Sequence, residues 1–60
     1  MFKVIKDNER YSVIDVRNTH YEGSYQVLEK SEDLPTGRIC GIYFNRKDAI
    51  DFFNKLTKGN

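Results

Sequence analysis

The last third of the chain changes its hydrophobic pattern from an alternation of period two to the pattern of an amphipathic helix. Alternate positions before Asn45 form two sets: Cys40, Ile42 and Phe44, and Ile39, Gly41 and Tyr43. After Asn45, apolar residues recur at helical spacing: Ala49, Ile50, Phe52, Phe53 and Leu56. Because side chains alternate along a strand and repeat every three to four residues along a helix, the pattern predicts a strand over residues 38–44 and a helix over residues 46–57.

The residues at the two ends of this segment favour the same helix. The side-chain oxygen of Asn45 suits a helix N-cap, and Asp48 lies three residues later, as in a capping box. Phe44 and Ala49 have the spacing of a hydrophobic staple across the helix start. Glycine takes the left-handed conformation that ends many helices at little cost, so Gly59 is expected to close this helix. These signals fix the expected helix boundaries.

Upstream of this segment, the chain reads as short strands separated by turn-forming residues. Apolar and β-branched residues predict strands over residues 2–6, 11–17 and 24–30. Asp7-Asn8 suits a tight hairpin turn, residues 18–23 form a polar connection, and Leu34-Pro35-Thr36-Gly37 matches a type I turn. The chain is therefore expected to be one small α+β domain over residues 1–60, with a ββββα order. Its antiparallel meander of three to four strands precedes one C-terminal helix packed on one face.

One helix is too narrow to cover such a sheet. A helix is about 10 Å wide, whereas four strands at about 4.8 Å spacing make a sheet nearer 15 to 20 Å wide. The set expected to face the helix is Cys40, Ile42, Phe44, Ile14 and Val16. The set expected on the far side is Tyr11, Val13, Ile39 and Tyr43, joined by Tyr25 and Ile5. For the strand over residues 24–30, both orientations fit, so either Tyr25 or Leu28 faces the helix.

Composition narrows the classes of partner. Ten basic and nine acidic residues give a net charge of +1, so the chain has neither a polybasic tail nor a strongly acidic surface. A single cysteine forms no internal disulfide, and there is no secretory or membrane-spanning apolar segment. These features predict a cytoplasmic protein that does not enter a membrane.

The sequence offers no catalytic or metal-binding constellation. Cys40 is expected to be an inert thiol buried in a strand, far from His20, which is the only histidine and lies in a loop. Glu29, Glu32 and Asp33 lack the ligand spacing of a calcium loop and are expected to be solvated. We therefore expect no enzyme activity, no catalytic residue, no cofactor, no metal and no small-molecule substrate.

The remaining function is binding through an exposed surface. Tyrosine and arginine are the residue types enriched at interface hot spots. The expected interface consists of Tyr11, Val13, Arg17, Tyr25, Arg38, Ile39 and Tyr43. The sequence thus predicts a non-catalytic protein-interaction module, of adaptor or inhibitor type, that docks through its open sheet face, a sheet edge or the helix. Its partner is expected to be another protein or a second copy of the chain.

The alternative is a domain that binds nucleic acid on its sheet. Tyr11, Tyr25 and Tyr43 would stack on bases. Arg10, Arg17 and Arg38 would contact phosphates. Residues 44–56 loosely resemble the last strand and helix of the three-stranded DNA-binding domains at the N-termini of tyrosine recombinases, which implies DNA binding. This resemblance covers the C-terminal third alone, and the chain lacks the basic strands of those domains, so no family is assigned from it.

Overall fold

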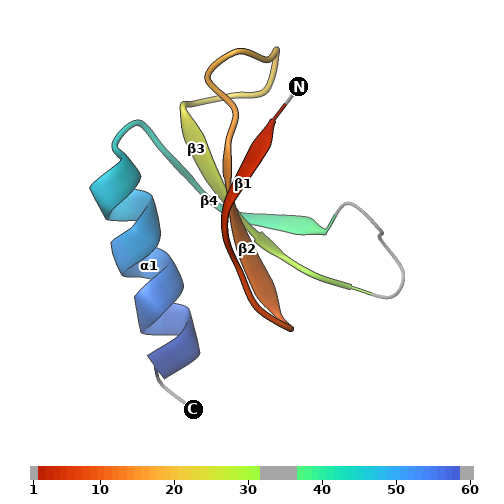
Figure 1. The fold of residues 1–60 in the computed structure, drawn as a ribbon, viewed down its shortest axis with the longest axis vertical. Helices are drawn as coiled ribbons and strands as arrows, with labels where there is room; N and C mark the ends of the chain where they lie inside the picture. Colours follow the sequence, from red (N-terminus) through yellow and green to blue (C-terminus); the bar gives the residue numbers. More distant parts are fainter. Residues whose placement is uncertain (1, 32–36, 59–60) are drawn as a thin grey trace.

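The computed structural model describes residues 2–31 and 37–58. Within these residues the fold consists of four antiparallel strands and one C-terminal helix (Figure 1). The strands are β1 (Lys3–Asp7), β2 (Tyr11–Asp15), β3 (Tyr25–Glu29) and β4 (Arg38–Tyr43), and the helix is α1 (Arg46–Lys58). Their order across the sheet is β1-β2-β3-β4, so every strand pairs with its neighbour in sequence. The predicted α+β meander with a terminal helix is confirmed.

The connection from β1 to β2 is held by the side chain of Asn8. Its Oδ1 accepts hydrogen bonds from the backbone N–H of Arg10 at 2.8 Å and of Tyr11 at 2.7 Å. The backbone N–H of Asn8 donates to the carbonyl of Tyr11 at 2.9 Å. This Asx-type turn explains why the hairpin forms at the predicted place, because the short amide side chain replaces a backbone partner.

The longer connection from β2 to β3 is also closed by hydrogen bonds. The N–H of Val16 donates to the carbonyl of Ser24 at 2.9 Å, and the Thr19 hydroxyl donates to the carbonyl of Val16 at 2.7 Å. Gly23 has a φ of +78°, a conformation that glycine adopts without steric cost. The type I turn predicted at residues 34–37 falls outside the described residues except for Gly37.

The helix begins where the sequence predicts, although its first turn differs in detail. α1 starts at Arg46, and the side-chain amide of Asn45 donates to the Asp48 carboxylate at 3.3 Å. The predicted staple is wrong, because Phe44 is 75% exposed. Lys58 ends the helix, where a positive charge favours the negative end of the helix dipole. Gly59, the predicted C-terminal cap, lies outside the described residues.

The core lies between α1 and one face of the sheet (Figure 1). Its buried members are Tyr11, Val13, Tyr25 and Val27 from the sheet and Ala49 and Phe53 from the helix. Partly buried residues around them are Ile5, Tyr43, Phe52 and Leu56. The helix contacts β2, β3 and β4 and leaves the other face without a helix. The prediction of a helix packed on one face is thus confirmed.

The predicted assignment of residues to the two faces is wrong. Tyr11 and Val13, which were expected on the far side, belong to the core beneath the helix, and Tyr43 and Ile5, also expected there, pack against that core. Tyr25, for which both orientations fitted the sequence, lies in the core as well. Ile14 and Ile42, expected to face the helix, lie on the opposite face, because they occupy alternate positions to Val13 and Tyr43. Val16 shares the alternation of Ile14 but follows the end of β2 and is buried, with 1% of its surface exposed.

A β-bulge in each edge strand interrupts the alternation of side chains. On β4, Gly41 pairs with Val27 and Ile39 pairs with Leu28, so Cys40 is an extra residue between them. A bulge places two residues against one on the neighbouring strand and therefore shifts the alternation of side chains. As a result Ile39 and Ile42 share a face even though three positions separate them. On β1, Ile5 is the extra residue.

Candidate protein-binding surface

The predicted aromatic anchors are mostly part of the core. Tyr11 is 9% exposed and Tyr25 is 7% exposed, and both pack beneath α1. Tyr43 is half-buried, with its ring centroid 5.7 Å from that of Phe52. Because most of the surface of Tyr11 and Tyr25 is already in contact with the protein, neither ring is available for stacking on a base. Val13, a fourth predicted interface residue, is fully buried.

Arg17 and Arg38, the two arginines of the predicted interface, are exposed, but their surroundings differ. Arg17 makes a two-pronged interaction with Asp15: its Nη2 lies 2.7 Å from Oδ2, and its Nε lies 3.0 Å from Oδ1. This hydrogen bonding lowers the pKa of the Asp15 carboxyl and raises the pKa of the Arg17 guanidinium. The Arg17 guanidinium also lies 5.4 Å from the ring centroid of Tyr25. Arg38 is exposed at the start of β4.

The face of the sheet away from α1, here called the open face, carries a different set of residues from the one predicted. The strand register places eight side chains on it: Val4, Asp7, Ser12, Ile14, Gln26, Leu28, Ile39 and Ile42. Ile39 is the one predicted interface residue that lies there. The structure therefore brings none of the three predicted tyrosines to this face.

Apolar side chains remain exposed at both margins of the open face. Val4 on β1 and Ile39 on β4 are each 57% exposed, whereas Ile14 between them is 3% exposed. Phe2 and Tyr21 extend the apolar surface beside Val4, since they are 44% and 55% exposed and their ring centroids lie 6.4 Å apart. Because Ile14 between them is buried, Val4 and Ile39 form separate exposed apolar patches, one at each margin of the open face. Exposed apolar patches commonly mark interaction sites.

The connection between β2 and β3 covers one end of the open face. A Cβ atom placed on Gly23 would lie 2.4 Å from Cγ2 of Ile42, so the backbone at Gly23 lies directly against that side chain. The side-chain amide of Gln26 donates to the carbonyl of Glu22 at 2.8 Å. These contacts account for the burial of Gln26, which is 4% exposed. They also hold the segment that carries Tyr21.

The open face carries no positive charge at its paired positions. The register places Lys3 opposite Asp15, Lys6 opposite Val13, and Arg38 opposite Glu29. All three cations therefore lie on the helix side of the sheet, and Asp7 is the one charged residue among the paired open-face positions. A phosphate backbone is bound chiefly through lysine and arginine, so this face suits an uncharged, apolar partner surface.

Both exposed edges of the sheet carry a bulge. Ile5 interrupts the pairing of β1, and Cys40 interrupts that of β4. Bulges and edge lysines are devices by which proteins discourage the addition of another strand. The edges are accordingly less suited to a partner than the open face is.

Cys40 is exposed, which corrects the prediction of a buried thiol. As the bulge residue of an edge strand, it is not inserted into the core. Partial burial and the nearby Glu29 carboxylate raise its pKa, which lowers the fraction of reactive thiolate.

The described residues contain no cluster of histidine, cysteine or acidic side chains able to hold a metal ion. His20 lies exposed in the connection between β2 and β3, as the sequence predicts. Glu29 is half-buried at the end of β3. Glu32 and Asp33, with which Glu29 was grouped in the sequence, fall outside the described residues.

Sequence reasoning missed Phe2, Val4 and Tyr21 as surface residues. One signal for the correct face lies in Gly41 and Tyr43. A Cβ atom on Gly41 would lie 2.7 Å from Cε2 of Tyr43, so the tyrosine ring lies over the glycine. An aromatic residue two positions from a strand glycine often packs in this way, and this pairing marks the side of β4 that the ring occupies.

The chain matches no family model, no curated protein and no solved structure. Within residues 2–31 and 37–58, no helix is both long and apolar enough to cross a membrane.

Proposed function

We propose that this chain is a non-catalytic protein-interaction module that docks on another protein through its open face. The observation that carries the proposal is the exposure of Val4 and Ile39 at the two margins of a face that bears no lysine or arginine at its paired positions. Burying such side chains against a partner contributes about 1.5 to 3 kcal/mol each. In this proposal the core beneath α1 holds the sheet in place, and the open face contacts the partner.

The mechanism is steric and hydrophobic. Val4 and Ile39 supply aliphatic contact area, and Phe2 and Tyr21 add aromatic area beside Val4. The hydrogen bonds from Val16 and Gln26 to the connection between β2 and β3 pre-organise the segment that bears Tyr21. A pre-organised surface loses little conformational entropy on binding, which favours an adaptor or inhibitor that acts by occupying a site on a larger protein.

The burial of Tyr11 and Tyr25 beneath the helix favours this proposal over the nucleic-acid alternative, which needs exposed rings for stacking. A cytoplasmic location is part of the proposal, since the single cysteine is a free thiol and a reducing compartment keeps thiols free. A second copy of the chain is the other partner class that fits an apolar face.

Site-specific crosslinking tests the proposal. A photoreactive phenylalanine analogue at position 39 is expected to capture a partner in the source cells, whereas the same analogue at position 54 on the exposed side of α1 is expected to capture none. With the captured partner purified, the double variant V4S/I39S is expected to weaken binding by at least about tenfold.

The matched control carries D51S and N54S, two substitutions at exposed positions of the helix. It is expected to bind like the unchanged protein. Equal binding by V4S/I39S and the unchanged protein would exclude the open face, and capture of the chain by itself would identify the partner as a second copy.

A further inference from the structure

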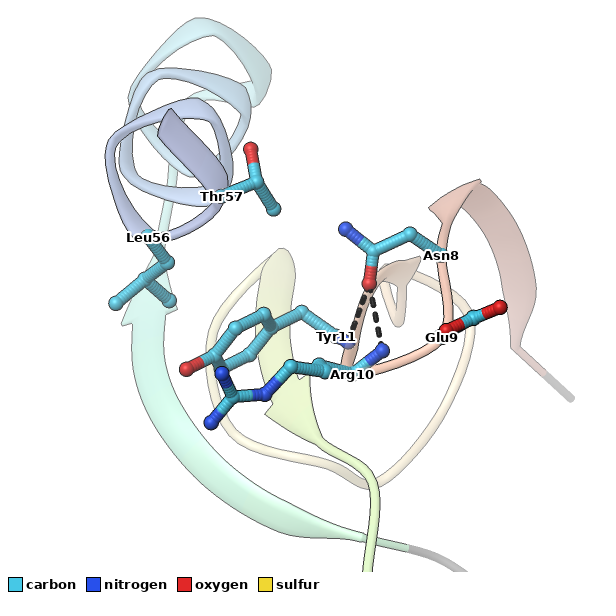
Figure 2. Close-up of a pocket in the computed structure, with 6 residues that line it drawn as sticks. All are labelled: Asn8, Glu9, Arg10, Tyr11, Leu56 and Thr57. Atoms are coloured by element: carbon cyan, nitrogen blue, oxygen red, sulfur yellow. Dashed lines mark hydrogen bonds between the residues drawn. The ribbon is translucent and has the colours of Figure 1, made fainter. Parts of the chain in front are cut away.

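A second surface feature lies at the end of the molecule where the β1–β2 turn approaches the last turns of α1. A hollow of about 320 Å³ lies there. Figure 2 shows the six residues that line it: Asn8, Glu9, Arg10, Tyr11, Leu56 and Thr57. Its volume is at the lower end of the range of ligand pockets, about 300 to 1,000 Å³. The hollow is separate from the open face, because Tyr11 faces the helix.

The turn that forms one wall is held firmly in place. Besides the hydrogen bonds accepted by Asn8 Oδ1, the Lys30 ammonium donates to the carbonyl of Asn8 at 2.6 Å. The backbone N–H of Lys30 donates to the carbonyl of Arg10 at 2.8 Å. The wall is therefore tied to the neighbouring strand β3 as well as to itself, so a ligand would meet a pre-formed surface.

The hollow combines an apolar wall with a guanidinium group. Leu56 is half-buried and supplies aliphatic surface opposite the turn, and the aromatic ring of Tyr11 forms part of the floor. The Arg10 guanidinium lies 5.7 Å from the centroid of that ring (Figure 2). Among the described residues, Arg10 forms no ion pair with a carboxylate.

Two charged residues line the hollow, Arg10 and Glu9. Lys55 and Lys58, in the last turn of α1, are next in sequence to the lining residues Leu56 and Thr57. Lys30 adds no net charge, because it is paired with Asp7.

We propose that this hollow binds an acidic peptide segment of a partner protein, with one bulky apolar side chain of the peptide against Leu56 and a neighbouring carboxylate on Arg10. The planar guanidinium suits two parallel hydrogen bonds to a carboxylate. The surrounding lysines attract the remaining acidic residues of the peptide and orient it before contact. This site stands independently of the proposed function of the open face.

A nuclear magnetic resonance titration tests the proposal. The probe is the capped peptide acetyl-Asp-Glu-Leu-Glu-Asp-amide, added to the full chain. Chemical shift changes are expected at the backbone amides of residues 8–11 and 55–58. Changes confined to other residues, or none at millimolar peptide, would overturn the proposal.

Arg10→Gln removes the positive charge and the planar guanidinium with its parallel N–H donors. It is expected to weaken peptide binding by about tenfold. The matched control is Arg46→Gln at the opposite end of the helix, which is expected to bind as before. Equal weakening by both variants would mean that net charge alone attracts the peptide, and this outcome would overturn the site.

Two changes of probe test the chemistry of the occupant. A peptide with Ser in place of Leu is expected to bind at least about threefold more weakly, because it loses the apolar contact. Equal binding by this peptide would overturn the role of Leu56.

A single-stranded oligonucleotide that shifts the same amides and displaces the peptide would identify a nucleic-acid site instead. Because V4S/I39S leaves the hollow untouched, it is expected to bind the peptide normally whether or not the open face has a partner.

Discussion

The two faces of the sheet carry different kinds of apolar residue. The face beneath α1 holds Tyr11 and Tyr25 beside two buried valines, whereas the open face holds mainly aliphatic residues, of which Val4 and Ile39 remain exposed. A tyrosine has a large apolar ring to bury and a hydroxyl that needs a polar partner or water. In so small a domain a single helix leaves the margins of the core near solvent, so tyrosines suit that core. Residue type alone therefore does not distinguish a binding surface from a core.

The largest expected difference in the free energy of unfolding is between substitutions of a buried and an exposed phenylalanine. Phe53 is 7% exposed in the core and Phe44 is 75% exposed. Phe53→Ala is expected to lower the free energy of unfolding by about 3 to 5 kcal/mol, because it leaves a cavity beneath the sheet. Phe44→Ala is expected to change it by less than about 0.5 kcal/mol. Urea denaturation followed by circular dichroism measures both, and equal losses would contradict the burial that separates them.

Two valines, one on each face of the sheet, allow the stability contributions of the two faces to be compared directly. Val13 is fully buried beneath the helix, and Val4 is 57% exposed on the open face. Val13→Ala is expected to cost about 2 kcal/mol through lost burial and a cavity. Val4→Ala is expected to cost less than about 0.5 kcal/mol. If Val4→Ala proved the more damaging substitution in thermal unfolding, the assignment of faces would be reversed.

Gly41 tests the packing at the margin of the covered face. Gly41→Ala places a methyl group against the Tyr43 ring, where Cβ would lie 2.7 Å from Cε2. The ring must move, at an expected cost of about 1 kcal/mol. In a Tyr43→Ser background the same substitution is expected to be neutral or stabilising, since alanine is more favourable than glycine within a strand. A double-mutant cycle measures this coupling, and its absence would show that the ring does not lie over the glycine.

The smallest expected effect concerns the ion pair between the partly buried Asp15, at the end of β2, and the exposed Arg17. Their hydrogen bonds lower the pKa of Asp15 below its ordinary value of 3.8. The ion pair therefore stabilises the folded state above that pH, and its contribution is lost as the pH falls through the lowered pKa. Asp15→Asn is expected to be slightly destabilising at pH 7 and neutral near pH 2. A difference between the two proteins that grew on acidification would contradict this sign.

The order and type of the elements were predictable from the sequence because each depends on local patterns. Asn8 and Asn45 mark the hairpin and the helix start through their own side chains, and the apolar spacing around Phe53 is unambiguous. These signals are read within a few residues, so no tertiary information is needed.

The faces of the sheet were not predictable in the same way. Along β2 both sets of alternate positions are apolar, since Val13 and Ile14 are adjacent and both buried. The alternation along β4 is broken by the bulge at Cys40, and a strand pattern does not reveal a bulge. The candidate surface depends on this assignment: Ile39 was placed on the correct face, whereas Tyr11, Val13 and Tyr43 were assigned to the wrong one.

The bulges at Ile5 and Cys40 also limit how recognition can change over evolutionary time. A partner that added a strand would be held largely by main-chain hydrogen bonds, which nearly any sequence supplies. With both edges interrupted, the recognition proposed for the open face would rest on side chains. Affinity would then be set residue by residue, and a substitution at Val4 or Ile39 would change the choice of partner while the backbone stays as it is.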